Sequence, residues 1–384
     1  MMIRDQERPF AELPAALVEE LLSHSGRLSE QIGDDLQKIR QKRQEIRESL
    51  ERSGLLRREG DLPAVAPPTT CGIDGAYAVE RLIAKDLVAV VAVAVEGLTP
   101  PSETRFWPEP RYRSYTTTEG HEEEIGTIAR GVMIGMELEL AVQAPHEVVF
   151  LDGSLTTPLI YFNQALNRAK EVPDLALKGC FLEQIEKYLQ AYWNILRAGR
   201  TDRAWVAVPK YSVRREIGQR LGWPRRIDDR AMLTNVLEPG EYTAPQPLEA
   251  PQQPWHLTLD PLYEQNRQEA ERLRSDIVQL LNEIRVTYYR PRSWLPALRL
   301  EMSRSVAETP ARLASVIQAL HYQCSAPGML EPYPLYLADR MVKHLGRVMP
   351  TLRQVTSQWL AKAYSGDLND IFLNLHSYRT ESGR

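Results

Sequence analysis

The sequence predicts an α/β domain with a helical arm at its N-terminal end and an α+β extension at its C-terminal end. Three observations support this prediction. Residues 12–53 repeat apolar side chains at helical spacing, strand-like and helix-like segments alternate over residues 70–208, and shorter helices and strands follow as far as residue 364. A chain of 384 residues with 43% hydrophobic and 26% charged residues can bury a sizeable core.

The N-terminal arm is predicted from a narrow apolar stripe on an otherwise charged segment. The stripe recurs at spacings of three, four and seven residues, at Leu28, Ile32, Leu36, Ile39, Ile46 and Leu50. Such a stripe either closes a dimer or packs within its own chain, and the sequence leaves both open. Ser53-Gly54 ends the helix, and Pro63, Pro67 and Pro68 predict an extended linker. We therefore expect an arm over residues 1–56, a linker over 57–68, a main domain over 69–364 and a tail over 365–384.

The main domain begins with a short strand, Thr70-Cys-Gly-Ile-Asp-Gly, that ends in Asp74-Gly75. Further strands are expected at residues 87–95, 111–118, 147–151 and 204–208, and helices at residues 121–144 and 175–200. Three antiparallel strands connected by hairpins, then two crossover strands with flanking helices, are typical of an RNase H-like core, although other α/β folds share parts of this order.

The extension is less regular. Helices are expected at residues 228–237, 262–284, 310–322, 335–345 and 352–364, and strands at residues 255–259, 286–290 and 297–302. Residues 245–254 form a loop rich in Pro and Gln.

Composition argues against several classes of protein. A net charge of -4 gives no general sign of nucleic-acid binding, although a local basic groove remains compatible with it. Cys71, Cys180 and Cys324 are far apart and predict neither a disulfide framework nor a CxxC metal site, which favours a reducing cytoplasm. The N-terminus lacks an apolar leader, and the apolar run over residues 87–95 is too short to span a bilayer. We expect a cytoplasmic protein with no membrane segment.

Asp74 and Asp152 each follow an apolar strand and each precede a glycine. A carboxylate at a strand end is held rigidly at the lip of a sheet, and the glycine lets another backbone or a phosphate come close. Two such carboxylates on neighbouring strands can bind one or two Mg²⁺ or Mn²⁺ ions. Ions in such a site would serve phosphodiester cleavage. Each dipeptide alone is also typical of a simple turn.

A third carboxylate is expected from the helix between the third and fourth strands. Glu137 shares a helical face with Met133 and Leu140, so it should point toward the sheet, while Glu139 lies nearer the edge of that face. An acid on an apolar face costs free energy unless it is paired or bound to a metal ion. We prefer Glu137 and keep Glu139 as the alternative.

A basic stretch follows the fifth strand. Residues 197–230 hold ten basic and four acidic residues, a net charge of +6, with Trp205, Tyr211 and Trp223 interleaved. Basic and aromatic side chains together are typical of a channel for single-stranded nucleic acid. Lys210 can hold a scissile phosphate there, or it can be a surface lysine. The residues expected to bind DNA are Lys210, Tyr211, Arg214, Arg215, Arg225 and Arg226.

Several short segments, in this order, resemble the NurA family of DNA nucleases. They are Gly72-Ile73-Asp74-Gly75, the helix glutamate Glu137, Phe150-Leu151-Asp152-Gly153-Ser154-Leu155, Val208-Pro209-Lys210, the block from Asp229-Arg230 to Glu241, and Pro332-Tyr333-Pro334-Leu335 to Asp339-Arg340. The resemblance covers residues 70–345. It departs from the family at Ala76, where the family usually has serine.

The resemblance implies an RNase H-like core that cuts DNA with Mn²⁺ or Mg²⁺, as a 5′→3′ exonuclease and single-strand endonuclease. It implies Asp74, Glu137, Asp152 and Asp339 as metal ligands and Lys210 as a catalytic residue; from its position alone, Asp339 can equally cap its helix. It also implies a homodimer that docks on a HerA-type hexameric ATPase in DNA end resection, repair or defence against foreign DNA. No Walker A sequence occurs in this chain, so the ATPase would be a separate protein.

The alternative function is a DNA-binding adaptor of such a translocase with weak or no catalysis. A sugar-kinase-like enzyme is a weaker third hypothesis.

Overall fold

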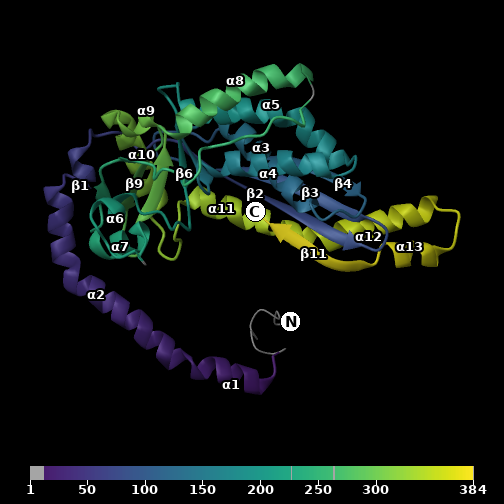
Figure 1. Ribbon diagram of the computed structural model, residues 1–384, viewed down its shortest axis with the longest axis horizontal. Helices are drawn as coiled ribbons and strands as arrows, with labels where there is room; N and C mark the ends of the chain where they lie inside the picture. The colour runs from purple at the N-terminus through teal and green to yellow at the C-terminus, as the bar shows by residue number, and fades with distance from the viewer. Residues whose placement is uncertain (1–12, 226, 263, 384) are drawn as a thin grey trace. The chain divides into compact units, whose positions relative to one another are not determined.

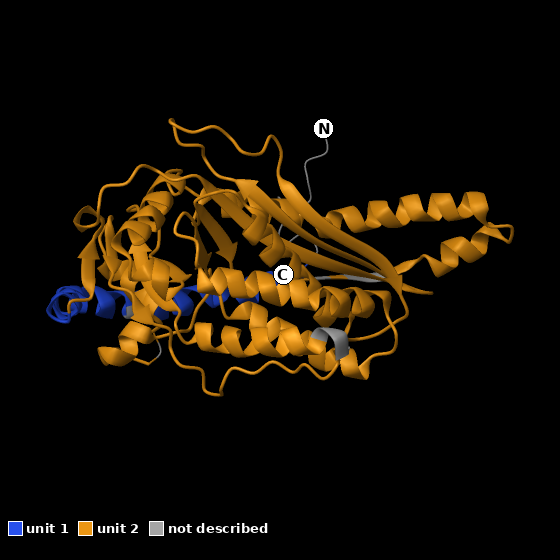
Figure 2. Cartoon of the chain, turned by 90° about the horizontal axis from the view of Figure 1, so that it is seen from above, with its two compact units in different colours: residues 1–53 blue, residues 54–384 orange. Residues whose placement is uncertain are grey.

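The computed structural model describes residues 13–225, 227–262 and 264–383, and the chain divides into two compact units, residues 1–53 and residues 54–384 (Figure 2). The first unit holds α1 (Ala15–Ser23) and α2 (Ser25–Arg52), which meet at His24. The helix predicted over residues 12–53 is therefore present as two consecutive helices.

A mixed sheet is the centre of the second unit (Figure 1). It includes the five strands predicted for the core, which are β2 (Thr70–Leu82), β3 (Asp86–Glu96), β4 (Arg111–Glu119), β5 (Val148–Asp152) and β6 (Ala204–Val208). Their order across the sheet is β4-β3-β2-β5-β6. The pairs β4–β3 and β3–β2 are antiparallel, and the pairs β2–β5 and β5–β6 are parallel. The apolar strands β5 and β6 lie inside the sheet, where both of their faces are covered.

The C-terminal extension continues the same sheet. β10 (Leu298–Met302) pairs antiparallel with β6, and the order goes on through β9 (Arg285–Arg290) and β7 (Glu241–Thr243) to β1 (Leu56–Arg58). β8 (Gln246–Pro247) pairs with β9, and β11 (Ser377–Gly383) pairs with β2. Parts of the expected linker and tail thus join the sheet, because the backbones of β1 and β11 find strand partners in β7 and β2.

Helices cover both faces of the sheet. α3 (Ile125–Gln143) packs on β2 and β3, and α4 (Thr157–Glu171), α5 (Ala176–Arg197) and α8 (Glu264–Leu281) continue that layer. Gly75 of β2 faces Met133 of α3, whereas Gly72 faces the backbone at the start of α11 (Tyr333–Lys343). Residues three apart in a strand point to opposite faces, so α3 and α11 sandwich β2.

The remaining elements are η2 (Glu59–Asp61), α6 (Glu216–Arg220), α7 (Asp229–Val236), α9 (Arg304–Ala307), α10 (Pro310–Gln323), α12 (Leu345–Ala363) and α13 (Leu368–Asn374). None of the helices in the described ranges is both long enough and apolar enough to cross a membrane.

The strand predicted over residues 255–259 is wrong. Its apolar side chains Leu257 and Leu259 are buried, which explains the strand-like pattern, but the segment is irregular. The backbone N–H of Thr258 donates to the side-chain oxygen of Asn163 at 2.8 Å instead of to a neighbouring strand. The sequence analysis also left α4 unassigned, although this helix supplies a wall of the site described below.

Gly72→Ala should destabilise the protein. A Cβ at residue 72 would lie 2.4 Å from backbone atoms of Pro334 and Leu335, which cannot move without shifting α11. We expect a loss of about 1–3 kcal/mol in the free energy of unfolding, measured by urea denaturation. Gly179→Ala is the matched control, because nothing lies within 4 Å of a Cβ there. It should stabilise helix α5 by up to about 1 kcal/mol. Equal stability of the two variants would contradict the close packing of α11 on β2.

Candidate metal centre

Asp74 lies in the middle of β2, which corrects the prediction that Asp74-Gly75 ends a strand. One edge of β2 pairs with β3 from Cys71 to Arg81. On the other edge, β5 pairs with residues 70–73 and β11 with residues 77–82. Residues 74–76 therefore lie in a gap between two strands that share an edge of β2. The strand continues beyond Gly75 because β3 and β11 both pair with its second half.

Asp152 is the last residue of β5, as predicted, and Gly153 follows it with a φ of 78°. This left-handed conformation favours glycine. The backbone N–H of Gly153 donates to Asp152 Oδ1 at 2.9 Å, and the N–H of Gly75 donates to Asp74 Oδ1 at the same distance. In each aspartate, Oδ1 accepts a hydrogen bond from the following glycine, and Oδ2 is left to interact with other groups of the site.

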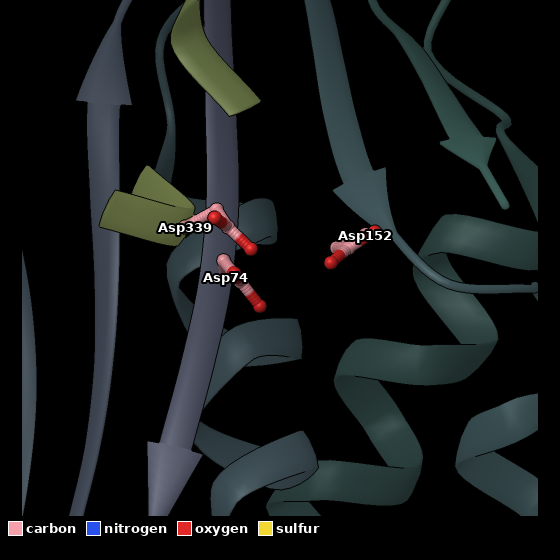
Figure 3. Close-up of side chains that lie close together, drawn as sticks. All are labelled: Asp74, Asp152 and Asp339. Carbon is pink, nitrogen blue, oxygen red and sulfur yellow. The ribbon is translucent and has the colours of Figure 1, made fainter. Parts of the chain in front are cut away.

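Three aspartates converge in the gap (Figure 3). One carboxylate oxygen from each of Asp74, Asp152 and Asp339 lies within 4.8 Å of the others. Asp339 comes from α11, which packs on the same face of β2 as Gly72 and Asp74. The sequence left Asp339 open between a helix cap and a ligand, and the structure places it in this cluster.

Glu137 approaches the cluster from α3, on the opposite face of β2. Its Oε1 would lie only 2.4 Å from a Cβ at residue 75, so Gly75 is the residue that admits it. Glu137 is buried, whereas Glu139 is partly exposed with an oxygen 3.9 Å from the guanidinium of Arg113. Of the two glutamates considered from the sequence, Glu137 is the one beside Asp74.

Burial and like charges raise the pKa values of these acids. Burial, followed by the charge of Asp152, raises the pKa of Asp74 to about 8, although Lys210 opposes the shift. Burial, followed by the charge of Asp74, raises the pKa of Glu137 well above its usual value. Asp74 Oδ2 is buried and has no hydrogen-bond partner in the described part of the chain. A divalent cation with a preference for oxygen ligands would offset this charge and use that oxygen, so these residues fit Mn²⁺ or Mg²⁺.

Lys210 is the cation beside the cluster. Its Nζ lies 3.1 Å from Asp152, 3.1 Å from Glu331 and 3.0 Å from Asp339. Burial alone would lower the pKa of Lys210, but the three carboxylates raise it. Glu331 is a further acid that the sequence analysis missed. It immediately precedes Pro332, so an acid at the border of the closing motif was the available signal.

The basic stretch after Lys210 contributes less aromatic surface than expected. Tyr211 is 95% exposed, but Trp205 and Trp223 are buried in the core, and Trp205 donates to the carbonyl of Ala141. These two tryptophans therefore offer no stacking surface to a nucleic acid, which corrects the predicted channel. Their apolar rings are better satisfied in the core than in water.

The arginines of the stretch lie in different surroundings. Arg225 is exposed and Arg214 partly exposed. Arg215 turns back to donate to the carbonyl of Trp223. Arg226 lies outside the described residues.

The acids open into a cavity of about 390 Å³. It is lined by Asp74, Met133, Ile134, Glu137, Asp152, Gly153, Ser154, Thr157, Tyr161, Pro209, Lys210 and Tyr211. Tyr161 comes from α4, so the helix that the sequence analysis left unassigned forms part of the wall.

A buried glutamate from β10 holds the turn after Asp152. Glu301 Oε2 accepts hydrogen bonds from Ser154 Oγ at 2.6 Å and from the backbone N–H of Leu155 at 2.9 Å. Glu301 Oε1 accepts from the fully buried Arg299, which also donates to both oxygens of Glu216. A charge-assisted network therefore connects the extension to the metal-site turn.

Asp74→Asn should stabilise the metal-free protein at pH 8. The pKa of Asp74 is higher in the folded protein, at about 8, than in the unfolded chain. The stabilisation from protonated Asp74 is fully present below the unfolded pKa, and it is lost as the pH rises through the folded pKa. We expect the variant to equal the parent near pH 4 and to exceed it by roughly 1–3 kcal/mol at pH 8 in a chelator. Saturating Mn²⁺ should reverse the order, because only the parent binds it tightly.

Thermal unfolding at several pH values measures this effect. Asp86→Asn is the control, because Asp86 is buried but is paired with Arg81 and His121. It should destabilise the protein, with no inversion by Mn²⁺. If the parent is more stable than Asp74→Asn at pH 8 in chelator, the charged carboxylate of Asp74 does not destabilise the metal-free protein, and the prediction is wrong.

Glu301→Gln should weaken Mn²⁺ binding about tenfold in calorimetric titration, because the groups that orient metal ligands affect affinity to that degree. Glu119→Gln is its control: Glu119 is also buried and accepts two backbone N–H groups, those of Ala176 and Leu177, at the start of α5. Both variants should lose stability, but only Glu301→Gln should lose affinity. Unchanged affinity in Glu301→Gln would show that the Asp152 turn does not need it.

Comparison with known proteins bears on this arrangement. Among solved structures, the NurA nuclease from Sulfolobus solfataricus is 14% identical, with a TM-score of 0.57 over 92% of this chain and 99% of that chain. A NurA structure with manganese is 13% identical, with a TM-score of 0.51 over 90% of this chain and 99% of that chain. A further NurA structure is 15% identical, with a TM-score of 0.52 over 90% and 98%.

At such identities the structural likeness shows the fold alone, a mixed α/β sheet with flanking helices. No curated protein matches the chain. The sequence model of the NurA domain, however, matches residues 68–344, which is most of the chain and spans every carboxylate of the cluster. The resemblance drawn from the short motifs is thereby confirmed, and the chain belongs to the NurA domain family.

Proposed function

We propose that this protein is a metal-dependent deoxyribonuclease. The observation that carries the proposal is the convergence of Asp74, Asp152 and Asp339 at the edge of a cavity that Asp74 and Asp152 line. One buried oxygen of Asp74 has no hydrogen-bond partner among the described residues. Buried acids with raised pKa values in a cavity are typical of functional sites. Membership of the NurA family and the likeness to a NurA structure with manganese support the reaction class.

Asp74, Glu137, Asp152 and Asp339 would hold Mn²⁺ or Mg²⁺ through their oxygens. Such an ion, when bound, supplies Lewis-acid activation of a phosphodiester. Lys210 already lies against Asp152 and Asp339, so its ammonium group would contact the scissile phosphate and offset its negative charge. Tyr211, Arg214, Arg215, Arg225 and Arg226 would guide the DNA, with Tyr211 offering an exposed ring for stacking.

The order β4-β3-β2-β5-β6 supports an RNase H-like core as the family's common scaffold. We place the nuclease domain at residues 69–364, after an N-terminal arm over residues 1–56. Ile39, Ile46 and Leu50 of the apolar stripe are buried within the chain, whereas Leu28, Ile32 and Leu36 are exposed and suit a homodimer contact.

Family membership further supports 5′→3′ exonuclease and single-strand endonuclease activity on DNA. It supports a role in end resection, repair or defence in the cytoplasm beside a HerA-type hexameric ATPase.

A second candidate is a DNA-binding adaptor of such a translocase. It is favoured by the two lysines at Asp339, since Lys210 lies 3.0 Å from one of its oxygens and Lys343 lies 2.6 Å from the other. These ammonium groups compete with a metal ion for Asp339. An absence of Mn²⁺ uptake by the parent in calorimetric titration would favour the adaptor.

Asp152→Ala should lower Mn²⁺-dependent cleavage of end-labelled single- and double-stranded DNA by at least about 100-fold, because it removes a group that organises charge in the site. Asp202→Ala is the control, since Asp202 is an exposed aspartate that pairs with Arg200 just before β6. It should cleave like the parent. If Asp152→Ala cuts as fast as the parent, the site assignment is wrong.

A further inference from the structure

Arg130 is a partly buried arginine on the same face of α3 as Glu137. Positions 130, 134 and 137 lie on one side of a helix, and Ile134 and Glu137 both line the cavity of the metal centre. The guanidinium of Arg130 lies 5.0 Å from the ring centre of Tyr161, another residue of that cavity. Arg130 therefore stands beside the cavity, about two helical turns from Glu137.

Tyr77 holds Arg130 from the other side. Arg130 Nη2 donates to the Tyr77 hydroxyl at 3.2 Å, and the guanidinium lies 5.8 Å from the Tyr77 ring centre. Tyr77 is three residues beyond Asp74 on β2, at the end of the gap in strand pairing where β11 begins to pair. Lys210 reaches the acids from the end of β6, so the two cations flank the gap from different elements.

The guanidinium has unused capacity for an anion. Across the described residues, no carboxylate lies within ion-pair distance of Arg130, and its Nε is buried without a hydrogen-bond partner. Arg168 of the neighbouring helix α4 contrasts with it, because Arg168 pairs with Glu124 at 3.3 Å and with Glu171 at 2.6 Å. Two tyrosine rings fix the Arg130 guanidinium by cation–π contact and leave its charge unneutralised.

We propose that Arg130, held between Tyr77 and Tyr161, binds a backbone phosphate of the DNA strand beside the phosphate that is cut. This inference rests on the proposed function and gives the strand a second fixed point in addition to Lys210. An arginine fork suits phosphate oxygens, and a cation held in place by packing loses little side-chain entropy on binding. Tyr161 supports the guanidinium and forms the cavity wall next to the bound nucleotide.

The experiment measures binding without cleavage. A fluorescein-labelled 20-nucleotide oligo(dT) is titrated with the full chain in chelator, and fluorescence anisotropy gives the binding constant at several salt concentrations. Arg130→Met should weaken oligonucleotide binding about five- to tenfold near physiological salt, because one phosphate contact and the counterion release that goes with it are lost. The slope of log K against log salt should fall by about 0.7, the value for one phosphate of a single strand.

Three comparisons make the result decisive. Arg130→Lys keeps the charge and should keep the salt slope. Arg168→Met removes an arginine that already has acidic partners, and it should change neither binding nor slope. Thermal unfolding reports whether Arg130→Met is folded. If it is not, Arg130→Gln replaces it as the neutral variant and should show the same loss of slope. An Arg130→Met slope equal to that of the parent, or a Lys variant with the Met slope, would overturn the proposal. Failure of the proposed nuclease would appear separately, as a parent that binds the oligonucleotide but does not cut it with Mn²⁺.

Discussion

Repulsion among buried carboxylates is the interaction on which the rest of this structure depends. Asp74, Glu137 and Asp339 are all buried, and Asp152 lies among them. Burial strengthens their mutual repulsion, because little water is present to screen it. Lys210 offsets part of the charge through Asp152 and Asp339, but Asp74 Oδ2 keeps no partner among the described residues. The fold thus maintains a cluster of acids whose charge is balanced either by protonation, which their raised pKa values favour, or by a further cation.

The architecture of β2 makes this concentration possible. The strand is bordered along one edge by β3 and is open on the other edge only between β5 and β11, at residues 74–76. α3 and α11 pack on the two faces of β2, each at a glycine that has no side chain to keep it away. Gly75 admits the carboxylate of Glu137 from α3, and Gly72 admits the backbone of α11, which carries Asp339. Acids from separate elements therefore reach one point without disturbing the sheet that supports them.

The extension stabilises this arrangement as part of the same sheet. Arg299 on β10 is fully buried and is bound by Glu301 and Glu216. Removing one partner from such a network is costly, so it fixes the geometry of what it touches. Glu301 accepts a hydrogen bond from Ser154 in the turn after Asp152. Glu216 is the first residue of α6, beside the basic segment that follows Lys210. The same charges thus connect the metal-site turn with the proposed DNA path.

Local patterns in the sequence determined the five core strands, their order, the face of α3 that carries Glu137 and the family of the chain. They did so because hydrophobic periodicity and short motifs are local properties. Only the tertiary structure decided the position of Asp74. Its strand is extended by pairing with β11, and its gap exists because β5 and β11 stop short of each other.

Tertiary packing also brought Asp339 and Glu331 to Lys210, buried Trp205 and Trp223, and left residues 255–259 without a strand partner. These outcomes depend on contacts between segments far apart in the chain. No spacing within a single segment encodes such contacts, which is why the sequence alone supplied the parts of the site but not the arrangement that unites them.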